Sequence, residues 1–164
     1  MKHIRVMAVM ALMAAVCCTA IRAEAEEGEE TWIGDEVYGY CEKYGEEYGI
    51  CAELIAAIIE RESSGCANAV NGDCKGLMQI SMSYHKDRME RLGVTDIWDA
   101  ESNIRIGADY LAELFGEYEE ASLVLDIYSG RGQKAFDNYD SGTMSGYAGG
   151  ILERSAELER VHNK

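Results

Sequence analysis

The residues best suited to chemistry lie in two neighbouring segments, one ending at Glu62 and the other spanning residues 76–80. Glu62 follows an apolar run, so its carboxyl group can enter a partly dry groove, and Gln79 can place an amide opposite it. Burial disfavours the charged form of a carboxyl group, so such a glutamate keeps its proton to a higher pH and can donate it to a leaving-group oxygen. We therefore interpret Glu62 as a candidate general acid.

The alternative for Glu62 is an exposed carboxylate at a helix end, which is the usual situation of a glutamate. The small residues 63–65 that follow it leave room for a ligand and favour a functional role. Glu60 is the competing acid on the same turn. It points roughly 200° away around a helix axis, so only one of the two carboxylates can face a groove.

Helical periodicity predicts helices over residues 31–48, 52–62, 81–92, 101–118 and 120–128, and a last helix from about residue 145 to 159. The helix over 52–62 is apolar nearly all round, which indicates the centre of a domain. Residues 65–75 form a polar loop, and residues 76–80 form a short extended segment. The expected fold class is therefore all-α, a single helical domain with an irregular loop and a short extended segment beside Glu62.

The first residues have the pattern of a targeting segment. A basic start and a short apolar run predict a signal peptide over residues 1–25, since the run is too short to span a bilayer. An uncleaved membrane anchor, or a lipoprotein modified at Cys17 or Cys18, stays open as an alternative. Residues 26–33 are predicted to be an acidic, disordered leader, and residues 34–160 the folded domain. The expected location is secreted or in the cell envelope.

The formal net charge of −15 excludes strongly anionic partners, because such a surface repels nucleic acid and anionic membranes. No His, Cys and Asp cluster has the spacing of a metal site, so we expect no metal and no cofactor. The lone His85 lies in a polar segment and is predicted to be solvated. We expect a monomer.

Cys41, Cys51, Cys66 and Cys74 remain after the predicted signal peptide. An even number in an exported chain favours two disulfides, with three possible pairings. We favour Cys66 with Cys74, because they flank one short loop, which leaves Cys41 with Cys51. Buried free thiols are the alternative.

Four motifs, taken together and in this order, resemble the lytic transglycosylase family, whose domain is soluble-lytic-transglycosylase or goose-lysozyme-like. They are Glu62-Ser63, the Gly-Leu-Met-Gln-Ile run at residues 76–80, the Asn-Ile-x-x-Gly-x-x-Tyr-Leu pattern at residues 103–111, and Tyr128-Ser129-Gly130. The Tyr128-Ser129-Gly130 motif stands where the family usually has Ala-Tyr-Asn-x-Gly. Each motif alone is weak, and the resemblance covers most of the chain after the predicted signal.

The resemblance implies a lysozyme-like helical fold and cleavage of the β-1,4 bond between N-acetylmuramic acid and N-acetylglucosamine in peptidoglycan glycan strands. It assigns Glu62 as the single acid and base, with attack by the C6 hydroxyl of the sugar giving a 1,6-anhydro product. A second protein carboxylate, which most glycosidases use, is then not needed. The resemblance also assigns substrate-binding roles to five residues, namely Ser63, Met78, Gln79, Tyr128 and Ser129.

Three of these residues have purely structural alternatives. Ser63 could be an ordinary serine near a helix C-terminus, and Met78 could be a core residue. We expect Tyr128 to form a hydrogen bond with Glu62 through its hydroxyl, and the alternative is a core tyrosine. Asn103 is expected to cap the long helix rather than to close a polar network.

Two departures from the family pattern affect substrate binding. Ser129 replaces the usual asparagine, and residues 130–132 read Gly-Arg-Gly instead of Gly-Pro-Gly. Two other functions therefore stay open, a hydrolytic muramidase in which water replaces the C6 hydroxyl, and a non-catalytic glycan-binding module on the same fold. A helical protein that binds a protein partner is a third, weaker alternative.

Overall fold

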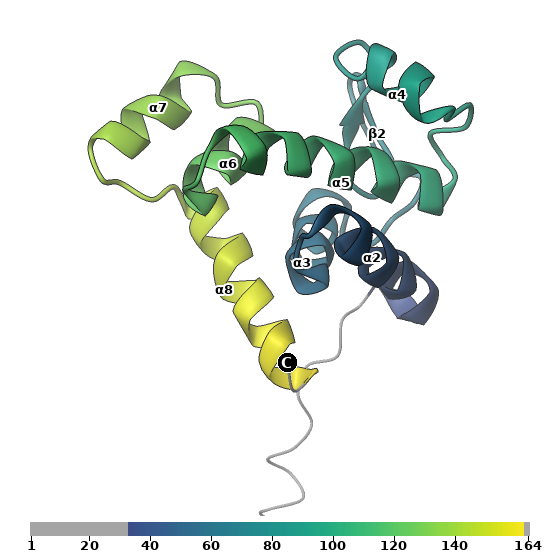
Figure 1. The fold of residues 1–164 in the computed structure, drawn as a ribbon, viewed down its shortest axis with the longest axis horizontal. Coiled ribbons are helices and arrows are strands. Elements are labelled where there is room, and N and C mark those ends of the chain that lie inside the picture. Colours follow the sequence, from purple (N-terminus) through teal and green to yellow (C-terminus); the bar gives the residue numbers. More distant parts are fainter. Residues whose placement is uncertain (1–32, 163–164) are drawn as a thin grey trace, which may run out of the picture. The chain divides into compact units, whose positions relative to one another are not determined.

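The computed structural model describes residues 33–162, which form seven helices and three short strands (Figure 1). In chain order the elements are α2 (Gly34–Tyr48), α3 (Ala52–Ser63), β1 (Val70–Asn71), β2 (Cys74–Lys75), β3 (Ile80–Ser81), α4 (Lys86–Leu92), α5 (Ala100–Glu117), α6 (Ala121–Tyr128), α7 (Gln133–Asp140) and α8 (Gly146–Val161). The predicted all-α class, with a short extended region after the Glu62 helix, is confirmed.

The expected signal peptide and the expected leader lie outside the described residues, with the exception of Ile33. Ile33 is buried and belongs to the core, so the folded part includes one residue that the sequence assigns to the leader. None of the helices within residues 33–162 is both long enough and apolar enough to cross a membrane.

Helix α3 forms the centre of the fold, as its apolar sequence predicts. It packs against α2 on one side and α8 on another (Figure 1). Ile55, Ile58 and Ile59 are fully buried, and each such side chain contributes about 1.5–3 kcal/mol by leaving water. The helix ends at Ser64, which takes a left-handed conformation (φ 52°) and whose N–H donates to the Glu60 carbonyl. Glu62 therefore lies in the last turn of a rigidly packed helix.

The three strands form a small antiparallel sheet in the order β1-β2-β3, with Lys75 paired to both Val70 and Ile80. The carboxylate of Asp73 accepts hydrogen bonds from Ser81 Oγ (2.8 Å) and from the Ser83 N–H (2.9 Å) and Oγ (2.7 Å). These bonds hold residues 81–83 in a turn. For this reason α4 begins only at Lys86, and the predicted start of that helix at residue 81 is wrong.

The structure also contains α7, a helix that the sequence does not predict. It packs against α6, and Ala135 is its one buried residue (Figure 1). The helix has only eight residues, most of them polar, and is therefore too short for a sequence pattern to predict it.

The cysteines form no disulfide in the described part of the chain. Cys41 is fully buried inside α2, where burial raises its pKa to about 12, whereas Cys51 is exposed at the start of α3 and donates to Glu53 Oε2. Neither predicted pair is therefore formed, and Cys41 matches the alternative of a buried thiol.

Candidate active site

Glu62 is half-buried at the end of α3, and burial raises the pKa of its carboxyl group above the ordinary value of 4.5. A hydrogen bond from Tyr147 and the charge of Arg61 act in the opposite direction, but burial is the largest effect. This is the electrostatic situation of a carboxyl group that can hold a proton for donation.

Tyr147 is the residue that holds this carboxyl group in place. Its hydroxyl donates to Glu62 Oε1 from the first turn of α8. Ser145 caps that helix by accepting from the Ala148 N–H (3.0 Å), which fixes the turn that carries Tyr147. The guanidinium groups of Arg61 and Arg131 lie over the Tyr147 ring at 5.7 and 5.9 Å from its centroid.

The sequence assigns this contact to Tyr128, and that assignment is wrong. The Tyr128 hydroxyl instead donates to the Met78 carbonyl (2.9 Å). Tyr147 is separated from Glu62 by 85 positions and lies in a segment where the sequence shows only a buried helix face. The buried tyrosine at the start of the last helix was the available signal, but nothing in its spacing points to Glu62.

A cavity of about 420 Å³ is lined by residues of β2, β3, α5 and α6 and of the segments next to them, and Glu62 is not one of its lining residues. Its lining includes Cys74, Gln79, Tyr128 and Ser129, together with Ile80, Ser81, Tyr84, His85, Tyr110, Ile127, Gly130, Gly132 and Phe136. Burial is the largest cause of the raised pKa of the Cys74 thiol and of the Tyr128 hydroxyl, and the charge of Glu62 adds to both, so the carboxylate lies near this part of the wall. The acid and the cavity therefore form one candidate site.

Gln79 lines the cavity in a conformation unusual for its type. Its backbone is left-handed (φ 49°), and its side-chain Nε2 donates to the carbonyls of Gly76 (2.9 Å) and Ala69 (3.2 Å). Both amide hydrogens are thus used to hold the turn, which leaves Oε1 as the group with which Gln79 can accept a bond from a ligand.

Met78 is not a surface residue of the cavity. Its side chain is fully buried, and its sulfur lies so close to Gly107 that a Cβ added there would be 2.3 Å from Sδ. The predicted packing of Met78 on a sugar is therefore wrong, and the core alternative holds. Met78 serves the site through its backbone, which binds Tyr128 and Asn103.

Asn103 joins this turn to the long helix α5. It is fully buried, accepts from the Met78 N–H (2.9 Å) and donates through Nδ2 to the carbonyls of Lys75 and Ile97 (3.0 Å each). The predicted capping role is wrong, because Asp99 caps α5 by accepting from the Ser102 N–H. The network alternative is the one that the structure contains.

The two other predicted binding residues differ in their exposure to the cavity. Ser129 lines it, and its Oγ donates to the Asp126 carbonyl (2.8 Å), so the oxygen can still accept from a ligand. Ser63 is half-buried beside Glu62 and donates to the Ile59 carbonyl (3.1 Å) within its own helix. This bond is the one expected of an ordinary serine near a helix C-terminus.

His85 also lines the cavity, and the prediction that it is solvated is wrong. It is 5% exposed, and burial together with the nearby Arg88 lowers its pKa to about 4. Within residues 33–162, no group of three or more His, Cys, Asp or Glu side chains could hold a metal ion.

Glu60 has a structural role on another side of α3, as the helix geometry predicts. It is buried and binds Arg154 of α8 through two hydrogen bonds (2.6 and 3.2 Å). We expect Glu60→Gln to lower the free energy of unfolding by about 1–3 kcal/mol, because the mostly buried Arg154 loses one of its carboxylate partners and keeps Glu157. Urea denaturation measures this loss, and a change below the experimental error would contradict it.

The hydrogen bond from Tyr147 stabilises the ionised form of Glu62, so the direction in which its removal changes the pKa of Glu62 can be predicted. We expect Tyr147→Phe to raise the pKa of Glu62 further and to move the high-pH limb of the activity profile to higher pH. Turnover should also fall by about 10- to 100-fold, because the carboxyl group loses its orientation. The pH dependence of kcat measures both effects, and a limb that moves to lower pH would contradict the assignment.

Comparison with known proteins agrees with this fold. The structure matches lytic transglycosylase Slt from Pseudomonas aeruginosa, solved as an inactive mutant, with a TM-score of 0.68 at 17% identity, over 81% of this chain and 25% of that one. The shared feature is therefore the lysozyme-like fold. Residues 39–154 match the family model described as the transglycosylase SLT domain. The chain belongs to this family.

Two curated relatives carry related names. A transglycosylase of Enterobacteria phage PRD1 is 32% identical over 108 residues, which is 65% of this chain and 38% of the relative. Membrane-bound lytic murein transglycosylase F of Desulfosudis oleivorans is 37% identical over 81 residues, which is 48% of this chain and 17% of the relative. The chain thus spans well under half the length of both.

Proposed function

We propose that this protein is a peptidoglycan lytic transglycosylase in which Glu62 is the single catalytic acid and base. The observation that carries the proposal is the half-buried Glu62, with a raised pKa, held by Tyr147 beside a cavity. Membership of the transglycosylase SLT family supplies the substrate class, the β-1,4-linked glycan strands of the cell wall.

In this mechanism Glu62 first donates its proton to the glycosidic oxygen between N-acetylmuramic acid and N-acetylglucosamine. The resulting carboxylate then takes the proton of the C6 hydroxyl of the muramic acid as that oxygen attacks C1. The products are a free 4-hydroxyl and a 1,6-anhydro ring, so no water is consumed. Tyr147 orients the carboxyl group and accommodates its charge in the intermediate step.

The composition of the cavity wall, which Glu62 adjoins without lining it, is consistent with a single-carboxylate mechanism. None of the described residues that line the cavity is an aspartate or a glutamate. A conventional two-carboxylate glycosidase needs a second acid within about 5–10 Å of the first, on the other face of the bond. Gln79 and Ser129 offer acceptor oxygens on this wall instead, and we propose that they bind the glycan. Tyr128 lines the same wall, and Ser63 lies next to Glu62 in α3.

We also propose an extracytoplasmic location, since the substrate lies outside the membrane and residues 1–25 have the composition of a signal peptide. The protein would act as a monomer, because the candidate site is built within one chain.

The test is mass spectrometry of the soluble fragments that the protein releases from purified peptidoglycan. Fragments that end in 1,6-anhydro-muramic acid, lighter by one water than reducing ends, are the expected result. Reducing ends would make the protein a muramidase. Binding to the wall material without any fragments would favour a non-catalytic glycan-binding module.

A further inference from the structure

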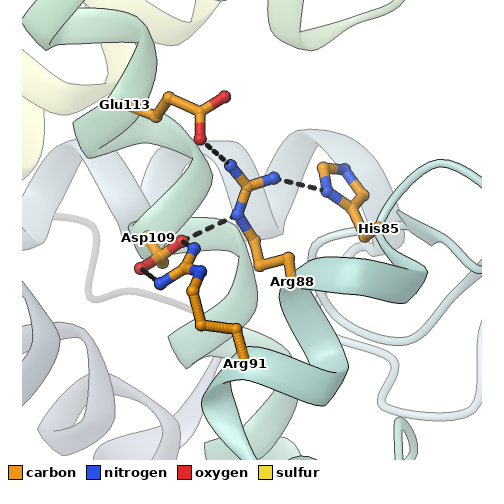
Figure 2. A network of polar contacts seen from close by, with 5 residues as sticks. All are labelled: His85, Arg88, Arg91, Asp109 and Glu113. Carbon is orange, nitrogen blue, oxygen red and sulfur yellow. Dashed lines mark hydrogen bonds and ion pairs between the residues drawn. The ribbon is translucent and has the colours of Figure 1, made fainter.

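A polar network surrounds the buried Arg88 (Figure 2), and one of its members, His85, lines the cavity. Arg88 of α4 donates through Nε to Asp109 of α5 (2.7 Å), through Nη2 to Glu113, and through Nη1 to His85 Nδ1 (2.8 Å). Arg91 also binds Asp109 (2.6 Å). Arg88 and Asp109 are each 9% exposed, so the positions of these groups are fixed by packing as well as by charge.

This network determines the protonation state of His85. A guanidinium group has no acceptor, so Arg88 must be the donor in the bond to His85 and Nδ1 must lack a proton. The ring is therefore neutral and carries its hydrogen on Nε2. The lowered pKa of His85, about 4, agrees with a neutral ring throughout the physiological range.

The Nε2–H group faces the cavity. The His85 ring lines the cavity, and its Nδ1 is turned toward Arg88 (Figure 2). Nε2 makes no hydrogen bond among residues 33–162 and is not one of the enclosed, unpartnered side-chain atoms there, so it keeps contact with open space. Because His85 is only 5% exposed and lines the cavity, an acceptor that enters the cavity, water or ligand, can take this hydrogen.

Four other polar side chains of the wall have already used their hydrogens. Gln79 donates both amide hydrogens to backbone carbonyls, Ser81 donates to Asp73, Tyr128 donates to Met78 and Ser129 donates to Asp126. These groups can accept from a ligand but do not offer a hydrogen. Nε2–H of His85 is a donor that a ligand carbonyl can reach.

Two aromatic rings contact the His85 ring. Tyr84 meets the His85 ring edge-on at 4.8 Å between centroids, and Tyr110 meets it at 4.7 Å. Tyr84 is 68% exposed, which is unusual for so large an aromatic side chain next to a cavity. A ring with an exposed face can stack on a sugar, and the neighbouring apolar edges suit a methyl group. A carbonyl beside a methyl is an acetamido group.

We propose that His85 and Tyr84 form a subsite for an N-acetylated sugar, in which Nε2–H donates to the acetamido carbonyl and Tyr84 packs on the sugar ring. The ligand is neutral, because the guanidinium group of Arg88 is already bound to Asp109 and Glu113. The assignment rests on the proposed function for its substrate class. The proposed subsite gives His85 the role of selecting acetylated over non-acetylated glycan.

The test uses two neutral probes, the β-1,4-linked tetrasaccharides of N-acetylglucosamine and of glucose, with the Glu62→Gln protein so that no bond is cleaved. Isothermal titration calorimetry measures the Kd of each probe. The substitution His85→Phe keeps an aromatic ring and removes the N–H donor. We expect it to raise the Kd of the acetylated probe about 3- to 10-fold and to leave the Kd of the glucose probe unchanged. His85→Gln keeps an N–H donor and should recover part of the affinity.

His162→Gln is the control, since His162 lies at the far end of α8 and does not line the cavity; it should change neither Kd. An equal loss for both probes, no loss for the acetylated probe, or no binding of that probe by the protein with His85 in place would overturn the subsite. Release of anhydro fragments from peptidoglycan is read separately, so failure of the subsite is distinguishable from failure of the proposed function.

A second measurement needs no substitution at His85 and covers the case in which His85→Phe does not fold. Nitrogen-15 NMR of the imidazole in the Glu62→Gln protein reports which nitrogen carries the hydrogen. We expect the Nε2–H form, and an Nε2 resonance that shifts with the acetylated probe and not with the glucose probe. A Nδ1–H ring, or an identical response to both probes, would overturn the proposal.

Discussion

Glu62→Gln is expected to reduce the release of fragments from peptidoglycan by about 10²–10⁴-fold, because a glutamine amide cannot donate a proton to the glycosidic oxygen. The side chains have nearly the same shape, so the amide can still accept the hydrogen bond from Tyr147. Binding of glycan should therefore persist while turnover is lost. Fragment release and sedimentation with insoluble peptidoglycan measure the two properties on the same sample.

The thermal stability of Glu62→Gln provides a second check, because the direction of its change relative to the parent can be predicted. The pKa of Glu62 is raised in the folded protein, so ionisation of this group opposes folding once the pH exceeds the unfolded value near 4.5. The penalty grows as the pH rises toward the folded pKa and is constant above it. Glu62→Gln should therefore equal or exceed the parent in Tm at pH 7, and this advantage should vanish below pH 4.

Glu60→Gln is the matched control, because it removes a carboxylate from the same turn of α3. This variant should lose stability, through Arg154, while its folded fraction retains activity. A protein in which the Glu60 change abolished turnover and the Glu62 change did not would show that the assignment of the acid is wrong.

Asn103→Ala is expected to lower the free energy of unfolding by about 3–4 kcal/mol, the largest stability effect that we anticipate outside the apolar core. The substitution removes two buried hydrogen bonds and one partly buried one, and it leaves the Met78 N–H and the carbonyls of Lys75 and Ile97 without this partner. Chemical denaturation at equilibrium measures the loss. Asn68→Ala, at an exposed position in the loop before β1, is the control and should change stability by less than about 0.5 kcal/mol.

The same network explains why Gly76 precedes the turn that carries Gln79. Its backbone is left-handed (φ 77°), and a Cβ there would lie 2.2 Å from Asn103 Nδ2. Loss of Asn103 should therefore also loosen Gln79 and weaken glycan binding in the fraction that stays folded. An Asn103→Ala protein with native stability would contradict the role that we assign to this residue.

Much of the fold follows from local sequence pattern. The apolar sequence of α3 determines that it is central, and the three- and four-residue repeats of α5 determine its buried face. The position of Glu62 at the end of a buried helix, and the glycine-led turn at Gly76, are equally local properties. Patterns of this kind are readable because the helix repeat places neighbours in sequence on one face.

The partners of these residues were decided by tertiary packing. Glu62 is held by Tyr147 rather than Tyr128, although both are tyrosines on buried helices, because the start of α8 brings a hydroxyl to the carboxyl group across 85 positions. His85 reads as a solvated residue in its own polar segment, but Arg88 and α5 enclose it. Sequence patterns identify which residues are buried and which could do chemistry. The choice among chemically equivalent side chains depends on distances between distant segments, which only the packed helices define.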